Sequence, residues 1–252
     1  MKRFDNKIAV VTGASGGIGK EIAIGFAEEG ASLAICARTE SKLHETAEIC
    51  RKLGVEVLAI TCDVSEYSQL ENFVNKINQK FGRIDILVNN AVSSDTMIPF
   101  IDQTIENLEK ALKSGLYATW HMMQLSFPLM KEHGGSIINF GSSASNGQPG
   151  LSSYGVAKAA ITALTRAVAS EWGEYNIRVN NMKPFAMTEN MKNLPEETRV
   201  FIEKNMKNST ALKRTGTPKS DIVPVVLFLA SDESQWMTGQ TLNAEGGSDI
   251  HE

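Results

Sequence analysis

The most informative part of this chain is the stretch Thr12-Gly13-Ala14-Ser15-Gly16-Gly17-Ile18-Gly19. It follows an apolar run over 8–11 and precedes a helical pattern over 20–29. A buried strand, a glycine-rich turn and a helix in that order form a phosphate site, because the start of the helix presents free N–H groups and the positive end of its dipole. Gly13, Gly17 and Gly19 let the backbone bend and approach a pyrophosphate closely.

Strand-like and helical segments alternate along the chain. Apolar runs predict strands over 7–12, 32–36, 55–61, 84–89, 135–140, 177–182 and 240–243. Helical patterns cover 17–29, 40–53, 66–81, 105–132, 153–174, 189–206 and 218–231. Near-continuous apolar strands are typical of a parallel sheet that is buried on both faces. We therefore predict a single α/β domain over 1–252, a doubly wound Rossmann fold with a parallel seven-stranded sheet and helices on both faces.

Composition is that of a globular protein and argues against several classes of partner. Hydrophobic residues make up 42% of the chain and charged residues 21%. A net charge of -4 provides no basic field for nucleic acid or an anionic membrane, and no apolar run approaches membrane-spanning length. The cysteines and histidines lack the spacing of metal ligands. We expect free thiols, a cytoplasmic location and no metal site.

Tyr154 and Lys158 stand four positions apart and therefore share one face of a predicted helix. A phenol with a pKa near 10 is a poor acid or base at neutral pH. A nearby ammonium favours the phenolate and lowers that pKa, so the pair predicts a tuned group for proton transfer. Ser142 follows the predicted strand over 135–140 and is placed to hydrogen-bond a substrate oxygen beside the tyrosine hydroxyl.

With these motifs in this order, the chain resembles the short-chain dehydrogenase/reductase family over nearly its full length. The resemblance rests on six matched pieces: the glycine turn at 12–19, Asp63-Val64, Asn89-Asn90-Ala91, the Ser142/Tyr154/Lys158 set, Arg178-Val179-Asn180 and the run over 238–247. Together these pieces are far more specific than the glycine turn alone.

The resemblance implies a role for each matched residue. Tyr154 would be the general acid in reduction and the base in oxidation. Ser142 would hold and polarise the carbonyl, and Lys158 would bind the nicotinamide ribose and lower the pKa of Tyr154. The implied cofactor-binding residues are Gly13, Ser15, Gly17, Ile18, Gly19, Arg38, Asp63, Val64, Asn90, Ala91, Tyr154, Lys158, Met187 and Thr188.

Four features depart from the family's pattern. Val92 and Phe185 stand where the family has glycines, which would narrow the space near the nicotinamide. Gly115 occupies the place of an asparagine that supports a proton-relay water in many members. Ser142 precedes the tyrosine by twelve residues where the family has thirteen, which we interpret as a one-residue deletion in the loop, with Ser143 as the alternative.

The end of the second predicted strand bears on the choice of cofactor. Folds that select NAD place a carboxylate there to bind the ribose 2′-OH, whereas Ala37 occupies that place here and Arg38 follows. An arginine at this position accommodates a 2′-phosphate. Gly16 stands where the family has a second basic residue, so only one of the two basic residues that favour NADP(H) is present. We predict NADP(H) in preference to NAD(H), with an ordinary surface role for Arg38 as the alternative.

The remaining expectations concern substrate and assembly. Apolar residues over 187–212 predict a substrate flap, although core packing explains most of them equally well. The acidic run over 171–174 disfavours an acidic carrier protein, so a small-molecule ketone or secondary alcohol is favoured over 3-oxoacyl-[acyl-carrier-protein] reduction. A non-catalytic NADP-binding regulator is a third hypothesis, which the intact Ser142/Tyr154/Lys158 set disfavours. Apolar residues on several faces of 105–132 indicate subunit contacts, and the resemblance implies a homotetramer or homodimer.

Overall fold

A parallel sheet of seven strands forms the centre of the computed structural model, which describes residues 2–93 and 97–250. The strands are β1 (Ile8–Thr12), β2 (Ser32–Ala37), β3 (Val57–Thr61), β4 (Ile86–Asn89), β5 (Gly135–Phe140), β6 (Ile177–Pro184) and β7 (Thr241–Ala244). Their order is β3-β2-β1-β4-β5-β6-β7, and all neighbouring pairs are parallel. The predicted sheet is confirmed. The direction of strand progression reverses between β1 and β4, and open α/β sheets bind ligands at the carboxyl edge of such a switch point.

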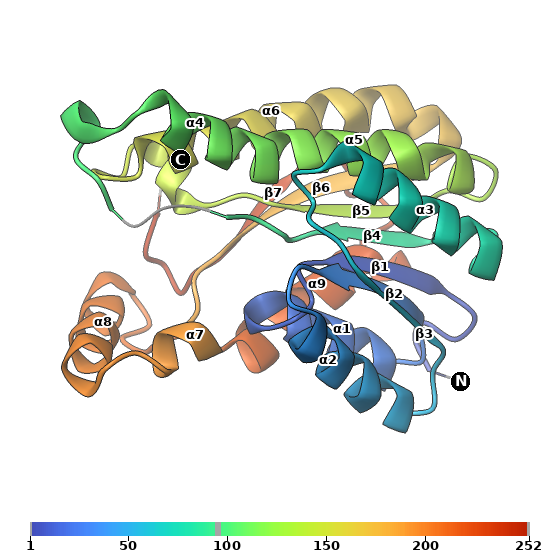
Figure 1. Cartoon of the computed structure of the whole chain (residues 1–252), viewed down its shortest axis with the longest axis horizontal. Coiled ribbons are helices and arrows are strands. Elements are labelled where there is room, and N and C mark those ends of the chain that lie inside the picture. The colour runs from blue at the N-terminus through green and yellow to red at the C-terminus, as the bar shows by residue number, and fades with distance from the viewer. Residues whose placement is uncertain (1, 94–96, 251–252) are drawn as a thin grey trace.

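Helices cover both faces of the sheet, so the predicted doubly wound architecture is confirmed (Figure 1). On one face lie α1 (Gly17–Glu28), α2 (Glu40–Lys52) and α9 (Val223–Ala230); on the other lie α3 (Tyr67–Phe81), α4 (Ile105–Ala111), α5 (Ala118–Ser126) and α6 (Ser152–Trp172). The short α7 (Glu189–Lys192) and α8 (Glu196–Ser209) stand apart from both layers (Figure 1). None of the helices in the described ranges is long and apolar enough to span a bilayer.

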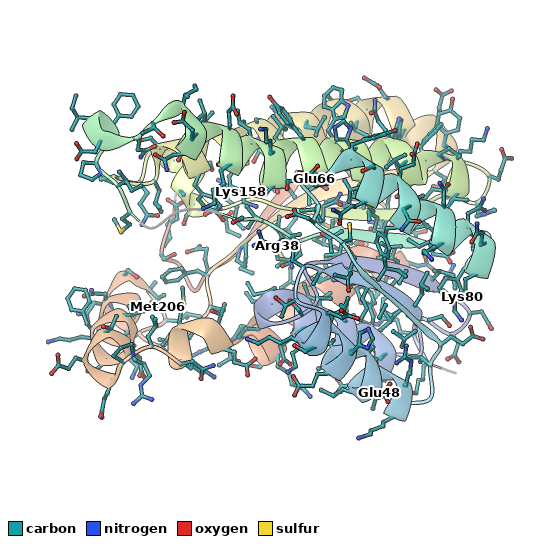
Figure 2. The ribbon with its side chains drawn as sticks, viewed as in Figure 1. Arg38, Glu48, Glu66, Lys80, Lys158 and Met206 are labelled. Carbon is teal, nitrogen blue, oxygen red and sulfur yellow. The ribbon has the colours of Figure 1, made fainter. Side chains whose placement is uncertain are left out.

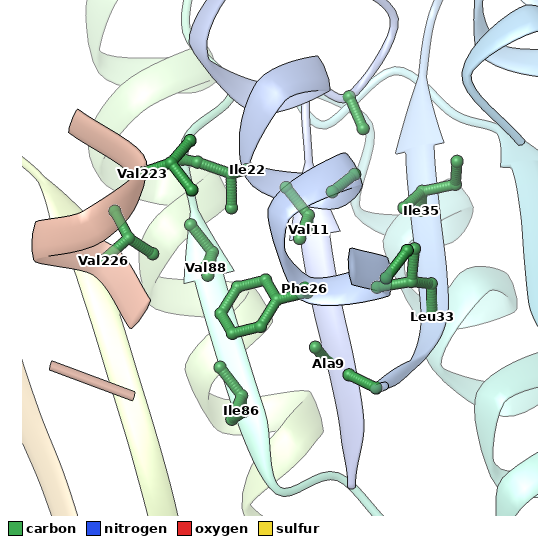
Figure 3. Close-up of a cluster of buried hydrophobic side chains, with 14 of the residues drawn as sticks. Ala9, Val11, Ile22, Phe26, Leu33, Ile35, Ile86, Val88, Val223 and Val226 are labelled. Atoms are coloured by element: carbon green, nitrogen blue, oxygen red, sulfur yellow. The ribbon is translucent and has the colours of Figure 1, made fainter. Parts of the chain in front are cut away.

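One core layer lies between the sheet and α1. Ile22 and Phe26 of α1 are fully buried in one cluster with Ile86 and Val88 of β4, and Val223 of α9 closes the side of this cluster (Figure 3). Burying a large apolar side chain contributes about 1.5–3 kcal/mol. This layer therefore holds α1 firmly against the sheet, and with it the glycine turn that precedes the helix.

The opposite layer contains a buried chain of polar side chains that joins β4, β5 and α6. Asn89 donates from Nδ2 to Asn139 Oδ1 at 2.9 Å, and Asn139 donates from Nδ2 to Thr165 Oγ1 at 2.9 Å. Asn89 and Asn139 are register partners on neighbouring strands. Buried polar groups are costly unless they are paired, so this chain favours a single placement of α6 over the sheet.

The predicted helix over 105–132 is interrupted. A π-helical segment, Leu112–Tyr117, separates α4 from α5, and the 3-10 helix Phe127–Leu129 ends the run. Ser114 Oγ lies 2.8 Å from the carbonyl oxygen of Lys110 and 3.0 Å from that of Ser93. A hydroxyl that takes a carbonyl of the preceding turn competes with the helical hydrogen bonds, which accounts for the change of helix type here.

The predicted helix over 189–206 is also divided, into α7 and α8. Pro195 is the N-cap of α8 and adopts an extended backbone with φ -49° and ψ 144°. A proline lacks the N–H that a continuous helix would use, so the chain turns at this point. Other short helical turns lie at Phe100–Asp102, Ser143–Asn146, Gly173–Tyr175, Pro218–Ile222 and Asp232–Ser234.

Candidate active site

The glycine turn between β1 and α1 is tied to the end of β4. Gly13 and Gly17 adopt φ values of +73° and +56°, which other residues rarely adopt. Asn90 donates from Nδ2 to the carbonyl oxygen of Thr12 at 2.9 Å, and the backbone N–H groups of Asn90 and Ala91 donate to Thr12 Oγ1 at 3.1 and 3.0 Å. These bonds make Asn90 a support for the turn.

Gly19 has no room for a side chain, whereas Gly16 does. A methyl group on Gly19 would overlap the carbonyl oxygen of Gly13 and Nδ2 of Asn90, but one on Gly16 would meet no atom within 4 Å. We expect Gly19→Ala to destabilise the fold by about 1–3 kcal/mol and to weaken cofactor binding. Gly16→Ala is the matched control. Urea unfolding and cofactor titration of both variants provide the measurement, and equal behaviour of the two would contradict the prediction.

A cavity of about 700 Å³ opens at the carboxyl edge beside this turn. Ten of the predicted cofactor residues line it: Gly13, Ser15, Ile18, Gly19, Arg38, Asp63, Val64, Asn90, Ala91 and Thr188. The predicted residues Gly17, Tyr154, Lys158 and Met187 do not line this cavity. Thr188 approaches the turn closely, since a Cβ on Gly17 would lie 3.9 Å from its Cβ. Cavity volume, glycine cradle and helix start all fit a dinucleotide.

Sequence reasoning missed one wall of this cavity. Glu106, Glu109 and Lys110 of α4 line it together with Lys113 and Ser114 of the π-helical segment. No motif marks these residues. Their position follows from the contact of Ser114 with the loop at Ser93, whose backbone N–H donates to Ser114 Oγ at 3.0 Å.

Arg38, labelled in Figure 2, lines the part of the cavity that the carboxyl ends of β2 and β3 form. Its Nη1 is 3.9 Å from Asp63 Oδ2, and its side chain is 62% exposed. Burial pushes the pKa of Asp63 upward, but hydrogen bonds from Ser65 and the charge of Arg38 leave it below its ordinary value. Asp63 is therefore ionised at neutral pH, and its carboxylate is the ion-pair partner of Arg38. Ala37 also lines this end and brings no carboxylate.

The three predicted chemical residues, Ser142, Tyr154 and Lys158, lie together at the carboxyl end of β5. Ser142 is the N-cap of the 3-10 helix Ser143–Asn146, where its Oγ accepts from the backbone N–H of Ala144 at 3.2 Å. Its side chain also lies close enough to the Tyr154 hydroxyl to stabilise the phenolate, which acts to lower the pKa of Tyr154. That contact favours Ser142 over the alternative, Ser143.

The pKa of Tyr154 differs from the prediction. Burial raises it, and the hydrogen bond with Ser142 offsets part of the rise, so the predicted lowering by Lys158 is wrong for this structure. The reason lies in the placement of Lys158, labelled in Figure 2. Its Nζ donates to the carbonyl oxygen of Phe140 at 2.5 Å and lies 5.5 Å from the centre of the Tyr154 ring. Burial also lowers the pKa of Lys158 to about 7, so its charge is partly lost at neutral pH.

Gly115 lies inside the π-helical segment and faces apolar side chains. A Cβ at this position would lie 3.8 Å from atoms of Ala157, Ile161 and Val92. These are ordinary contacts, so the site tolerates a small side chain but offers no polar group of its own. The asparagine of the family thus has no polar replacement at this position.

The segment 187–212 mixes buried and outward-facing apolar side chains. Met187 and Met206 are buried, whereas Phe201 and Leu212 are 66% and 65% exposed. The end of the segment is held by the C-terminal tail, because the backbone N–H groups of Ala211 and Leu212 donate to the carbonyl oxygens of Gly247 and Gly246 at 3.3 and 3.1 Å.

The chain is similar to several known proteins over nearly its full length. A family model described as Enoyl-(Acyl carrier protein) reductase matches residues 13–249. The 12alpha-hydroxysteroid dehydrogenase of Clostridium sp. (strain ATCC 29733 / VPI C48-50) is 40% identical and covers 98% of each chain. The 7alpha-hydroxysteroid dehydrogenase of Escherichia coli (strain K12) is 36% identical over 97% of this chain and 95% of its own. The crystal structure of NAD+-bound xylitol dehydrogenase is 30% identical, with a TM-score of 0.89 over 98% of this chain and 100% of its own.

Proposed function

The chain belongs to the short-chain dehydrogenase/reductase family, whose members use NAD(P), and is an oxidoreductase of CH–OH and C=O groups; from this premise we propose that it interconverts a ketone and a secondary alcohol with NADP(H). Tyr154 is the acid and base of the proposed reaction. The observation that carries the proposal is the proximity of the Ser142 side chain to the Tyr154 hydroxyl, with Lys158 beside the tyrosine ring.

In the proposed reduction, the hydroxyls of Ser142 and Tyr154 hold the carbonyl oxygen, and Tyr154 donates its proton as the alkoxide forms. The cofactor supplies the hydride. The raised pKa of Tyr154 keeps the phenol protonated at neutral pH, which suits a proton donor. Lys158 positions the tyrosine from the ring side. Thr188 binds the cofactor from the wall of the cavity described above, and Gly17 and Met187 complete its binding beyond that cavity.

The substrate of this proposal is a small molecule with a bulky apolar body. Two relatives are hydroxysteroid dehydrogenases. The proposed substrate flap, residues 187–212, presents the exposed side chains of Phe201 and Leu212. In the 3-10 helix Phe100–Asp102, which precedes α4, Phe100 and Ile101 are 78% and 90% exposed. Apolar side chains of this kind become buried when an apolar ligand binds.

The test is NADPH oxidation with a panel of ketosteroids, smaller ketones and a 3-oxoacyl-[acyl-carrier-protein]. The proposal expects turnover of a free ketone and little of the carrier-bound substrate. Preference for the carrier-bound substrate would favour the 3-oxoacyl-[acyl-carrier-protein] reductase alternative. Cofactor binding with no turnover of any carbonyl would favour the non-catalytic regulator.

The proposed assembly is a homotetramer built on α5 and α6. Tyr117 at the start of α5 and Trp120 within it are each 47% exposed, and Val156 of α6 is 54% exposed. Large apolar side chains on an outer helix face are typical of subunit contacts. Sedimentation velocity would test this assembly, and a monomer at micromolar concentration would contradict it.

We expect Arg38→Ala to weaken NADPH binding by about 10- to 150-fold and NADH binding far less, because a charge-assisted bond to the 2′-phosphate contributes about 1.5–3 kcal/mol. Ala37→Asp should shift preference toward NADH, since it adds a ribose acceptor and repels the phosphate. Titration of both cofactors into the wild type and the two variants is the measurement. Equal affinity of the wild type for NADH and NADPH would contradict the prediction.

A further inference from the structure

Lys183, near the end of β6, carries a charge that the proposed chemistry does not use. Its side chain is half-buried, and its Nζ donates to Asn146 Oδ1 at 3.2 Å. Within residues 2–93 and 97–250, no carboxylate lies within 4.0 Å of this ammonium. A lysine ammonium has three N–H donors, and a neutral amide oxygen satisfies only one of them.

The ammonium lies beside the loop that carries Ser142. Side chains alternate along a strand, so Lys183 shares the face of Asn181, whose Nδ2 donates to Thr162 Oγ1 of α6 at 3.1 Å. Its partner Asn146 ends the 3-10 helix that Ser142 caps. The 3-10 helix Ser143–Asn146 therefore lies between Ser142 and the amide that binds the lysine, and at about 2.0 Å per residue it spans roughly 6 Å.

The amide that binds this lysine also contacts an acid. Asp249, in the C-terminal tail, accepts a hydrogen bond from Asn146 Nδ2, and its carboxylate lies more than 4.0 Å from the Lys183 ammonium. Asn146 thus presents its oxygen to the lysine and its nitrogen to the aspartate. The positive charge of Lys183 faces the loop of the candidate site and is separated by the Asn146 amide from the negative charge of Asp249.

We propose that Lys183 is a specificity-determining residue that binds a carboxylate on the substrate, at the end of the 3-10 helix Ser143–Asn146 that is remote from Ser142. This inference rests on the proposed function of the same site. A carboxylate forms charge-assisted hydrogen bonds with an ammonium, which are stronger than the existing bond to an amide. Because this helix lies between the lysine and Ser142, the proposal expects a substrate whose carboxylate and carbonyl lie on different parts of a medium-sized body, and not a 2-oxo acid.

Equilibrium binding tests this role without requiring turnover. Cholate, a hydroxysteroid carboxylate, and its uncharged methyl ester are titrated into the NADP(H)-bound Tyr154→Phe protein. We expect cholate to bind at least about tenfold more tightly than the ester. Adding Lys183→Met should remove this difference by weakening cholate alone, whereas Lys183→Arg should retain it. Asp249→Asn is the control, and it should leave cholate binding unchanged or tighter because it removes a negative charge.

Three results would overturn the inference. Equal affinity for cholate and its ester would show that no anion is recognised. Equal weakening of both ligands by Lys183→Met, or a loss with Asp249→Asn as large as with Lys183→Met, would make the lysine a structural clamp on the loop and tail. Failure of cholate to bind would reject the substrate class, while the ketone panel reports independently on the oxidoreductase itself.

Discussion

Tyr154→Phe is expected to lower kcat for ketone reduction by about 10²- to 10⁴-fold while NADPH affinity stays close to that of the wild type. The substitution removes the hydroxyl that donates the proton and keeps the ring that packs beside Lys158. It also removes the hydroxyl that lies close to the Ser142 side chain. The remaining serine hydroxyl holds the carbonyl oxygen but supplies no acid matched to the reaction.

The measurement is kcat at saturating substrate together with fluorescence titration of NADPH. Tyr175→Phe is the matched control, because Tyr175 packs its ring edge-on against Phe127, away from the loop of Ser142. This control should retain the activity of the wild type. Retention of most of kcat by Tyr154→Phe would reject the tyrosine as the acid, and loss of NADPH affinity would assign it a binding role instead.

Lys158→Met is expected to stabilise the protein at low pH and to destabilise it at high pH. In the wild type, burial lowers the pKa of Lys158 from 10.5 to about 7. Below pH 7 both the folded and the unfolded chain hold the proton, and the folded chain bears the full cost of a buried ammonium. Between pH 7 and 10.5 the folded chain is neutral while the unfolded chain stays protonated, so the cost shrinks and wild-type stability rises with pH.

The magnitude follows from linkage. Lowering the pKa of Lys158 from 10.5 to about 7 destabilises the folded wild type by on the order of 5 kcal/mol below pH 7. The Lys158→Met substitution removes this cost. Met also leaves the carbonyl oxygen of Phe140 without the bond from Nζ, at a cost of about 1–3 kcal/mol. The variant should therefore be more stable than the wild type at pH 6.5 and less stable at pH 10.5, while losing cofactor affinity and activity.

Chemical unfolding at both pH values, without cofactor, tests this expectation. Lys183→Met is a suitable comparison, because it removes an ammonium that is half-buried rather than fully buried. A Lys158→Met variant that is less stable than the wild type at pH 6.5 would contradict the low pKa.

Much of this structure could be predicted from local chemistry. Gly13 and Gly17 stand at positions that require positive φ, and that requirement is visible in the sequence as glycine. The buried parallel strands could be located because both of their faces are apolar. The sequence predicts that a serine lies beside Tyr154 but leaves two candidates, Ser142 and Ser143. Residue spacing in a loop does not determine where each hydroxyl points.

The features that could not be predicted depend on tertiary burial and packing. The pKa of Tyr154 is raised because the folded chain covers its ring, and no local pattern reports how complete that cover is. The π-helical segment arises where Ser114 also contacts the loop at Ser93, a contact across the fold. The ion pair of Arg38 with Asp63 likewise joins residues that follow different strands.

The attachment of the C-terminal tail has a practical consequence for handling this protein. Gly246 and Gly247 bind the end of the segment 187–212, and Asp249 binds the loop after Ser142. A purification tag or fusion partner joined at the C-terminus would therefore disturb both the segment 187–212 and the loop after Ser142. The residues before β1 lie at the opposite, amino edge of the sheet, so the N-terminus is the better attachment point for tags, surface immobilisation or display.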